Sequence, residues 1–244
     1  MAGYVAAGIL YGGIVGGALK KLGNCRKFGI TPNATIKKRI SRMIGTNGQV
    51  LDSASLAEPA KLVIEMDEWN TENLRDAAMG TVVDATQEAG TDVEKTFDLT
   101  AVEPDGYYPL GKRRVSGVSV TVASVTKTEG VHYELDAEIG YIKFLSAIGS
   151  TGSAVVTFDC AAIATGTVIL GGTEASIKRH YLLRANNEAD GSHWEIEVWE
   201  ATLKPTSETD YMTEEFTVLG FEGEMNTPAG KTSPYETRHF PAAA

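Results

Sequence analysis

The sequence predicts a mainly β protein: a β-sandwich or barrel with one short flanking α-helix, a long projecting hairpin loop and a β-rich insertion. Residues 61–67 alternate apolar and polar side chains, which is the period of a strand with one buried face. The same alternation recurs at 115–127 and 192–203. Between 105 and 166, short strand patterns follow one another at regular spacing, which is typical of a sandwich or barrel.

One stretch has helical spacing instead. Asn70 offers a side-chain oxygen to the free amides of a helix start. Leu74 and Ala77 then fall on one face, and Gly80 is suited to ending a helix. We expect a helix over 71–79 that covers an end or side of the sandwich, because its apolar face is small.

The chain is expected to form one core with additions. The predicted parts are a sandwich core from 1–104 and 167–225, a β-rich insertion at 105–166, and an extended C-terminal arm at 226–244. The last segment has three prolines and no apolar pattern, which is why we expect an arm.

The apolar start of the chain, residues 3–19, raises the alternative of a membrane helix. Six glycines in this stretch lower its helix propensity strongly. The basic pair Lys20–Lys21 follows the apolar run, whereas a signal peptide begins with basic residues. We therefore expect a glycine-interrupted pair of strands and no membrane span.

Residues 34–70 predict a long hairpin or loop that projects from the sandwich. Ile36, Ile40 and Ile44 share one face of an expected strand over 34–44, while Lys37 and Arg39 occupy the other. The dipeptide Asn47–Gly48 is a strong tight-turn signal. We expect 45–59 to be a loop that projects from the sandwich.

If the arms of this hairpin pair antiparallel, Lys37 and Arg39 are placed to face Glu65 and Asp67, and opposite charges across strands are favourable. A long hairpin has few contacts within its own chain. The alternatives are a flexible loop and an arm that docks on a neighbouring subunit.

Composition excludes some function classes. The formal net charge of -10 argues against a protein that binds nucleic acid tightly on a basic surface, because such a surface needs clustered Lys and Arg. Two cysteines, Cys25 and Cys160, are too few for a disulfide framework, and we expect both to be reduced.

The residues predict no catalytic, metal or cofactor site. The four histidines have no metal-ligand spacing. Glu195, Glu197, Glu222 and Glu224 match a paired-carboxylate hydrolase, but strand alternation alone places such residues on a solvated face. We expect the chain not to be an enzyme.

Three segments in sequence order resemble the phage major tail tube protein family. The segment 19–28, LKKLGNCRKF, resembles the LGN-containing opening of tube subunits. The strand 60–68 and the helix 70–80 resemble their strand–helix core. The segment 133–145, YELDAEIGYIKFL, resembles a Y-x-V-D-x-x-x-G-x-I-x-F-L pattern of phage tail proteins.

The resemblance implies a structural virion protein of long-tailed phages, assembled in the host cytoplasm into stacked hexameric rings. The implied partners are other copies of the chain, a tape measure protein, tail terminator and tail tip or baseplate proteins, and DNA that passes non-specifically through the lumen. An acidic wall repels phosphate. The candidate lumen residues are Glu65, Asp67, Glu195, Glu197, Glu222 and Glu224. The candidate contacts between subunits or rings are Lys37, Arg39, Arg42, Asn47, Gly48, Gln49 and Asp52.

Two rival hypotheses remain. A β-sandwich binding module, for carbohydrate or for decorating a capsid, would use Trp69, Trp194 and Trp199 as an aromatic platform. A hydrolase would depend on Glu197.

Overall fold

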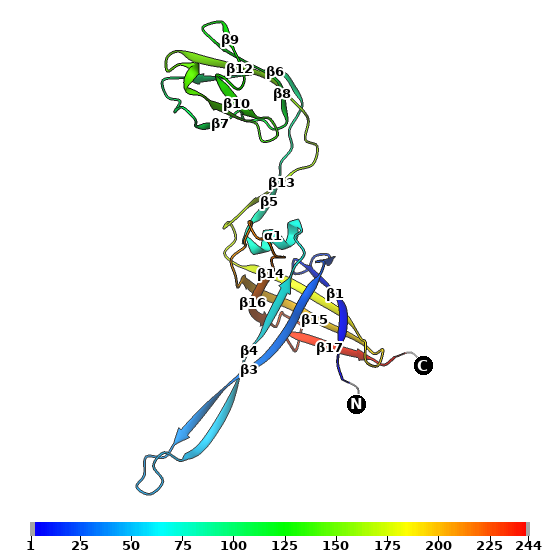
Figure 1. Cartoon of the computed structure of the whole chain (residues 1–244). Helices are drawn as coiled ribbons and strands as arrows, with labels where there is room; N and C mark the ends of the chain where they lie inside the picture. Colours follow the sequence, from blue (N-terminus) through cyan, green and yellow to red (C-terminus); the bar gives the residue numbers. More distant parts are fainter. Residues whose placement is uncertain (1–2, 243–244) are drawn as a thin grey trace. The chain divides into compact units, whose positions relative to one another are not determined.

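The computed structural model describes residues 3–242, and the chain divides into two compact units (Figure 1). Unit 1 comprises Met1–Val83 and Ile169–Ala244, and unit 2 comprises Asp84–Val168. Each unit has its own cluster of buried apolar side chains. The predicted fold class is confirmed: antiparallel strands dominate, and residues 3–242 contain one α-helix.

Unit 1 is built on one antiparallel sheet in the order β2-β1-β14-β15-β16-β4-β3, with β17 pairing alongside β15. The strands are β1 (Ala6–Gly13), β2 (Lys20–Lys21), β3 (Cys25–Ile40), β4 (Val50–Met66), β14 (Ile177–Asn187), β15 (His193–Pro205), β16 (Leu219–Asn226) and β17 (Tyr235–Phe240). The glycine-rich start of the chain forms β1 and β2, which confirms the strand pair predicted there.

Strand alternation gives this sheet an inner and an outer face. Leu62 and Ile64 of β4 are fully buried and belong to the main core, whereas Val63 and Glu65 between them point outward. Tyr181 of β14 and Phe221 of β16 extend the same core. We call the side opposite this core the outer face.

The helix α1 (Thr71–Ala77) covers part of that core, as predicted. The Asn70 side chain accepts a hydrogen bond from the Asn73 amide at 2.9 Å, so the predicted N-cap is confirmed. The helix ends two residues earlier than expected, and the left-handed residue after it is Met79, with φ 46°. Gly80 has a different role, because a Cβ there would lie 2.5 Å from the Leu170 carbonyl oxygen.

The hairpin of β3 and β4 extends well beyond the body of unit 1 (Figure 1). The turn occupies 41–49, where Gly48 has a φ of 88° and its amide donates to the Ser41 carbonyl at 3.0 Å. The expected loop 45–59 is therefore wrong over most of its length, because 50–59 belongs to β4. Small residues such as Ser53 and Ala54 pair within the ladder, which their composition alone does not reveal.

The C-terminal arm also needs correction. Residues 235–240 form β17, whose Tyr235 pairs with Val198 and whose Thr237 pairs with Ile196 of β15. Among residues 226–242, the expected extended arm is therefore wrong for the six residues of β17. The strand was missed because Thr237 and His239, which share a side of β17 with Tyr235, are polar and leave no apolar pattern.

Unit 2 holds a three-stranded sheet, β10-β11-β7, and a four-stranded sheet, β6-β12-β8-β9. Its elements are β6 (Gly90–Asp98), β7 (Tyr107–Pro109), β8 (Val115–Val122), β9 (Val125–Lys127), β10 (Tyr133–Asp136), β11 (Tyr141–Phe144), the 3-10 helix η1 (Ser146–Ile148) and β12 (Ser153–Cys160). Phe144, Phe158 and Val156 are at the centre of its core.

The insertion therefore begins at Asp84, about twenty residues before the predicted start. The reason is that β6 pairs with β12 over most of its length, so 90–98 belongs to unit 2. The two connecting segments pair with each other as β5 (Thr81–Asp84) and β13 (Thr167–Leu170).

Candidate functional site

The outer part of the β3–β4 hairpin, residues 31–59, is the most exposed ordered segment of unit 1, and we call it the arm. Every residue of the arm is exposed except Thr35, Ser41 and Thr46. Its exposed apolar side chains are Ile36, Ile40, Met43, Ile44, Val50, Leu51 and Leu56. A surface with so many exposed apolar side chains is typical of an interaction site.

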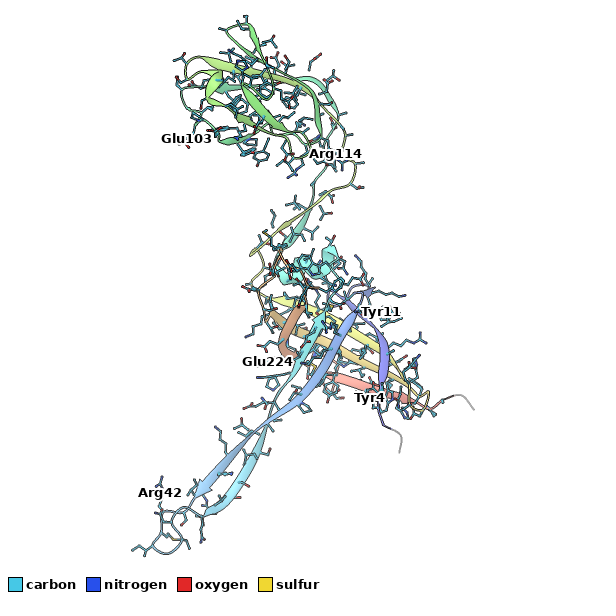
Figure 2. All side chains as sticks on the ribbon, viewed as in Figure 1. Tyr4, Tyr11, Arg42, Glu103, Arg114 and Glu224 are labelled. Atoms are coloured by element: carbon cyan, nitrogen blue, oxygen red, sulfur yellow. The ribbon has the colours of Figure 1, made fainter. Side chains whose placement is uncertain are left out.

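The arm is also basic, although the chain as a whole is acidic. Its charged residues are the cations Lys37, Lys38, Arg39 and Arg42 and the anions Asp52 and Glu58. Figure 2 shows Arg42 at the far end of the arm. The arm thus carries a net positive charge in a chain whose formal net charge is -10.

The strand register places each candidate contact residue of the arm. Ile36 pairs with Ser55 and Ile40 with Val50, on the face opposite Lys37 and Arg39, as predicted for these four side chains. The strand is shorter than predicted, because β3 ends at Ile40 and Ile44 lies in the turn. Asn47, Gly48 and Gln49 lie in the turn or at its end.

The predicted partners of Lys37 and Arg39 are wrong. Lys37 pairs with Ala54 and Arg39 with Asp52, because the chain reverses at 41–49 and not farther along. Glu65 is instead paired with Lys27, whose Nζ lies 3.0 Å from the carboxylate.

Five of the six candidate acidic residues lie together on the outer face of the main sheet, on β4, β15 and β16. Glu65 and Glu222 alternate with buried neighbours on adjacent strands, and Figure 2 shows Glu224 on this sheet. Glu195 and Glu197 lie on the same face of β15. Asp67 lies just beyond β4, where it accepts a hydrogen bond from the Asn24 side chain at 2.6 Å.

Most of these carboxylates are paired with cations. Arg238 of β17 lies 3.0 Å from Glu197 and 3.7 Å from Glu195, and Lys204 lies 3.3 Å from Glu222. The outer face therefore alternates charges instead of forming a purely acidic wall. Arg238 was not among the predicted site residues because its strand was not predicted.

A bulge between β14 and β15 shapes the centre of this face. The register shifts between Arg179 and Tyr181, so His180 stands opposite two residues of β15. The His180 ring nitrogen Nε2 lies 3.1 Å from the Glu197 carboxylate. The Glu197 side chain is only 16% exposed and already holds two partners, which leaves it little freedom to act on a substrate.

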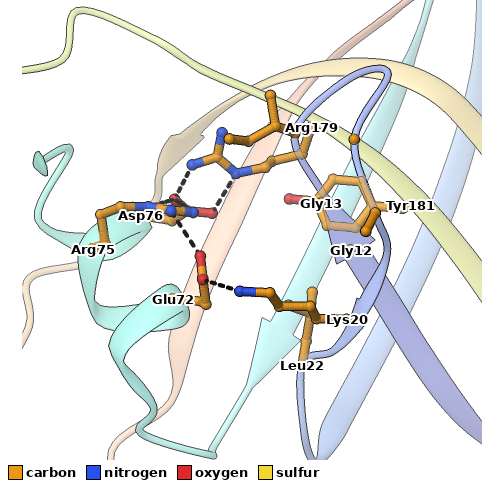
Figure 3. A pocket seen from close by; sticks show the side chains of 12 residues that line it. Gly12, Gly13, Lys20, Leu22, Glu72, Arg75, Asp76, Arg179 and Tyr181 are labelled. Atoms are coloured by element: carbon orange, nitrogen blue, oxygen red, sulfur yellow. Dashed lines mark hydrogen bonds and ion pairs between the residues drawn. The ribbon is translucent and has the colours of Figure 1, made fainter. Parts of the chain in front are cut away.

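A hollow of about 230 Å³ lies between β1, α1 and β14 (Figure 3). Gly12 and Gly13 form one wall, and a Cβ on Gly12 would lie 2.7 Å from Leu22 Cδ1. The opposite wall is charged: Arg179 donates to Asp76, and Arg75 lies 2.7 Å from Glu72.

The charges in this hollow are paired, and their pKa values follow from that pairing. The hydrogen bond from Lys20 lowers the pKa of Glu72, with the charge of Arg75 acting in the same direction. Burial opposes the charged form of Arg179, but the hydrogen bond and charge of Asp76 outweigh it and raise its pKa. Burial raises the pKa of Tyr181, so this phenol stays protonated. These ion pairs connect α1 to β2 and β14 and so have a structural role.

The three tryptophans do not form one aromatic platform. Trp194 points to the inner side of β15, where its ring lies 4.4 Å from that of His239. Trp199 lies beneath Lys231, with Nζ 3.2 Å from the ring centroid. Trp69 packs edge-on against Tyr211, with ring centroids 5.5 Å apart.

An apolar groove of about 530 Å³ does exist at the end of β15, next to β3 and β17. Its aromatic lining is Tyr4, Phe28, Trp194 and Tyr235. The Trp194 indole Nε1 is buried and, within the described part of the chain, has no hydrogen-bond partner.

The described residues, 3–242, also bear on metal, membrane and thiol chemistry. No group of three or more His, Cys, Asp and Glu side chains there is arranged to hold a metal ion. No helix among these residues combines the length and the apolar character that crossing a membrane requires. Cys25 and Cys160 are both free thiols, and burial raises the pKa of Cys25 to about 11.

Comparison with known proteins gives a family and no function. No curated protein matches the chain. Residues 3–235 match the model of a family described as "Protein of unknown function UCP028589". Since this match spans nearly the whole sequence, the chain belongs to that family.

Proposed function

We propose that this chain is a structural subunit of a phage tail tube, not an enzyme. In this proposal it assembles with copies of itself into stacked hexameric rings within the virion tail, after synthesis in the host cytoplasm. Tape measure, tail terminator and tail tip or baseplate proteins would be its partners. DNA would pass through the lumen without specific binding.

The observation that carries the proposal is the arm. Two paired strands extend from the body with their apolar side chains in water, Ile36 at 60% and Ile40 at 48% exposure. Full burial of an isoleucine side chain stabilises by about 1.5–3 kcal/mol, and a single copy does not gain that stabilisation. A second copy that covers the arm would bury these side chains and gain that stabilisation.

The exposed edge of the main sheet also supports self-assembly. The main sheet ends at β2 on one side and at β3 on the other, so β3 is an edge strand over its full sixteen residues. Long exposed edges pair readily with other chains unless they are protected. Lys37, Lys38 and Arg39 on β3 oppose indiscriminate pairing, which favours one specific partner surface over aggregation.

The outer face suits a passage for DNA. Cations of this face such as Arg238 and Lys204 are paired with carboxylates, which weakens their attraction for phosphate. Glu222 and Glu224 occupy exposed positions of β16, and because Lys204 pairs with Glu222, the added negative charge comes from Glu224. Such a surface would repel a DNA duplex or bind it only weakly.

Electron microscopy and sedimentation velocity of the purified protein over a concentration series test the proposal. Rings or tubes are the expected result. The matched variant replaces 32–60 with a two-residue Asn-Gly turn, since Thr31 and Lys61, which would then flank the turn, already pair across the hairpin. This variant should fold and remain a monomer. A wild-type chain that stays monomeric at every concentration, with tape measure protein present, would disprove the proposal.

The apolar groove beside Trp194 favours one alternative, a binding module. Aromatic side chains such as Tyr4 and Tyr235 give the groove surfaces on which a sugar ring can stack. Titration of tryptophan fluorescence with a glycan panel distinguishes the two functions: a saturable shift in emission supports the module, and an unchanged spectrum removes it.

A further inference from the structure

The loop between β15 and β16, residues 206–218, carries the second strongly exposed apolar patch of unit 1. Met212 and Phe216 are each 92% exposed and Tyr211 is 71% exposed. We call this segment the receiving loop. Its charged residues are all acidic: Glu208, Asp210, Glu214 and Glu215.

The receiving loop is held in place against the end of β4. Trp69 packs edge-on against Tyr211, and its indole Nε1 donates to the Thr217 carbonyl at 3.4 Å. Asp210 accepts a hydrogen bond from the Met212 amide at 2.8 Å, which forms a local turn. These contacts give the receiving loop a defined conformation, so its exposed apolar side chains form a fixed surface.

Trp69 and the receiving loop enclose a cleft of about 340 Å³. Its walls combine the aromatic rings of Trp69, Tyr211 and Phe216 with the carboxylates of Asp67, Asp210 and Glu215. Among residues 3–242 none of these three carboxylates forms an ion pair. Aromatic faces beside free carboxylates suit the side chain of an arginine or lysine flanked by apolar residues.

The tip of the arm has that chemistry. Arg42 lies between Ile40 and the exposed pair Met43–Ile44, and Arg39 lies close by in β3. The arm is positive and the receiving loop is negative, and both expose apolar side chains. Charge complementarity of this kind steers association and sets the register between surfaces.

The two surfaces lie at opposite ends of β4, so they cannot meet within one copy. Val50 begins the strand at the arm's turn, and Met66 ends it beside Leu219, where the receiving loop returns to the sheet. The strand is seventeen residues long, which corresponds to roughly 55 Å at about 3.3 Å per residue.

From this arrangement we infer that the tip of the arm, residues 39–44, docks with Arg42 in the cleft between Trp69 and the receiving loop of a second copy. Each copy then gives one tip and receives another. Such a head-to-tail contact uses two different patches, so it propagates from copy to copy until it closes a ring or extends a filament. The inference rests on the proposed self-assembly and names the surface that receives the arm.

Cysteine cross-linking between copies tests the contact directly. One copy carries Met43→Cys and the other carries Met212→Cys, both in a Cys25→Ser background. Cys160 is buried and stays in place. A short bis-maleimide should link the two variants only when they are mixed, and a chain with both substitutions should give a ladder. The matched control copy carries Val131→Cys, which is 54% exposed and lies in unit 2.

Charge reversal provides a second, independent test. Arg42→Glu should lower the cross-link yield with Met212→Cys by about tenfold. Adding Glu215→Arg to the receiving copy, which leaves the turn made by Asp210 in place, should restore much of the yield. Equal labelling of Val131→Cys and Met43→Cys by the receiving copy would overturn the inference.

Electron microscopy of the same mixtures separates this inference from the proposed function. Tubes without a tip-to-loop cross-link would overturn the docking and leave the function standing. A cross-link without rings or tubes would support the docking and count against the function. Neither product would overturn both.

Discussion

Arg179 of β14 donates from Nε to Asp76 of α1 at 3.0 Å and so ties together two segments that are 103 positions apart in the sequence. A second donation from its terminal nitrogen reaches the other carboxylate oxygen, and Arg75 lies 3.0 Å from that same oxygen. Figure 3 shows how these groups hold the helix against the sheet. One carboxylate therefore serves two guanidinium groups.

Removing that carboxylate should destabilise unit 1. Asp76→Ala leaves Arg179 and Arg75 without their shared partner, and we expect a loss of about 2 kcal/mol in the free energy of unfolding. Urea denaturation followed by tryptophan fluorescence is the measurement, because all three tryptophans lie in unit 1. Glu138→Ala, which removes the exposed partner of Arg114 in unit 2, is the control and should leave this transition in place.

Stability in acid should depend on Glu72. The hydrogen bond from Lys20 lowers its folded-state pKa below the ordinary value of 4.5. The contribution is complete above that ordinary value and is lost as pH falls through the lower folded-state pKa. Since the side chain is partly exposed, we expect only a few tenths of a kcal/mol. Glu72→Gln and Lys20→Met should each flatten the same part of the stability curve below pH 4.5, and an unchanged curve in both would contradict this assignment.

Two strand glycines should respond oppositely to the same substitution. A Cβ on Gly223 of β16 would overlap the Thr202 carbonyl of β15, whereas the nearest atom to a Cβ on Gly29 of β3 is 4.0 Å away. Gly223→Ala should therefore cost about 2–3 kcal/mol, because two paired backbones must separate. Gly29→Ala should be neutral or slightly stabilising. The urea midpoint of each variant gives the answer, and equal midpoints would show that β15 and β16 adjust without strain.

Local features of this fold were predictable because local chemistry determines them. Asn70 caps α1 through its own side chain, and Gly48 allows the left-handed backbone that the hairpin turn needs. The alternation of Leu62 and Ile64 with Val63 and Glu65 identifies which face is buried. It also explains why five of the six candidate acidic residues share the face opposite the core, whereas Asp67 lies beyond the end of β4.

Pairing between distant segments was not predictable in the same way. A strand pattern identifies a face but not a neighbour, so the partners assigned to Lys37 and Arg39 were wrong. The early start of unit 2 depends on the pairing of β6 with β12, about sixty residues away. The receiving loop was missed as well, although its run of acidic residues with Tyr211, Met212 and Phe216 was a readable signal.

Unit 2 should be removable without loss of unit 1. The two cores share no residue, and the connecting segments are already paired, with the Ala85 amide 2.9 Å from the Gly166 carbonyl oxygen. Replacing 85–166 with an Asn-Gly turn should leave the tryptophan-detected urea midpoint nearly unchanged. A variant that aggregates, or that unfolds at a clearly lower urea concentration, would show that unit 1 depends on unit 2.

The arm offers the sharpest separation between stability and assembly. Ile36 and Ile40 are exposed in the single copy, so Ile36→Thr combined with Ile40→Thr should change the free energy of unfolding by less than about 0.5 kcal/mol. Threonine keeps the β-branched shape that suits a strand, and it replaces the ethyl branch of isoleucine with a hydroxyl.

If the arm is covered in the assembled state, the same double variant should weaken self-association by about tenfold or more, since apolar area that would be buried is lost. Sedimentation velocity over a concentration series measures this shift. The matched control, Val125→Thr with Val131→Thr, changes two exposed β-branched residues of unit 2 and should leave association unchanged. Equal weakening by both pairs would mean that general surface hydrophobicity drives association, whereas weakening by the arm pair alone identifies the hairpin as the contact surface.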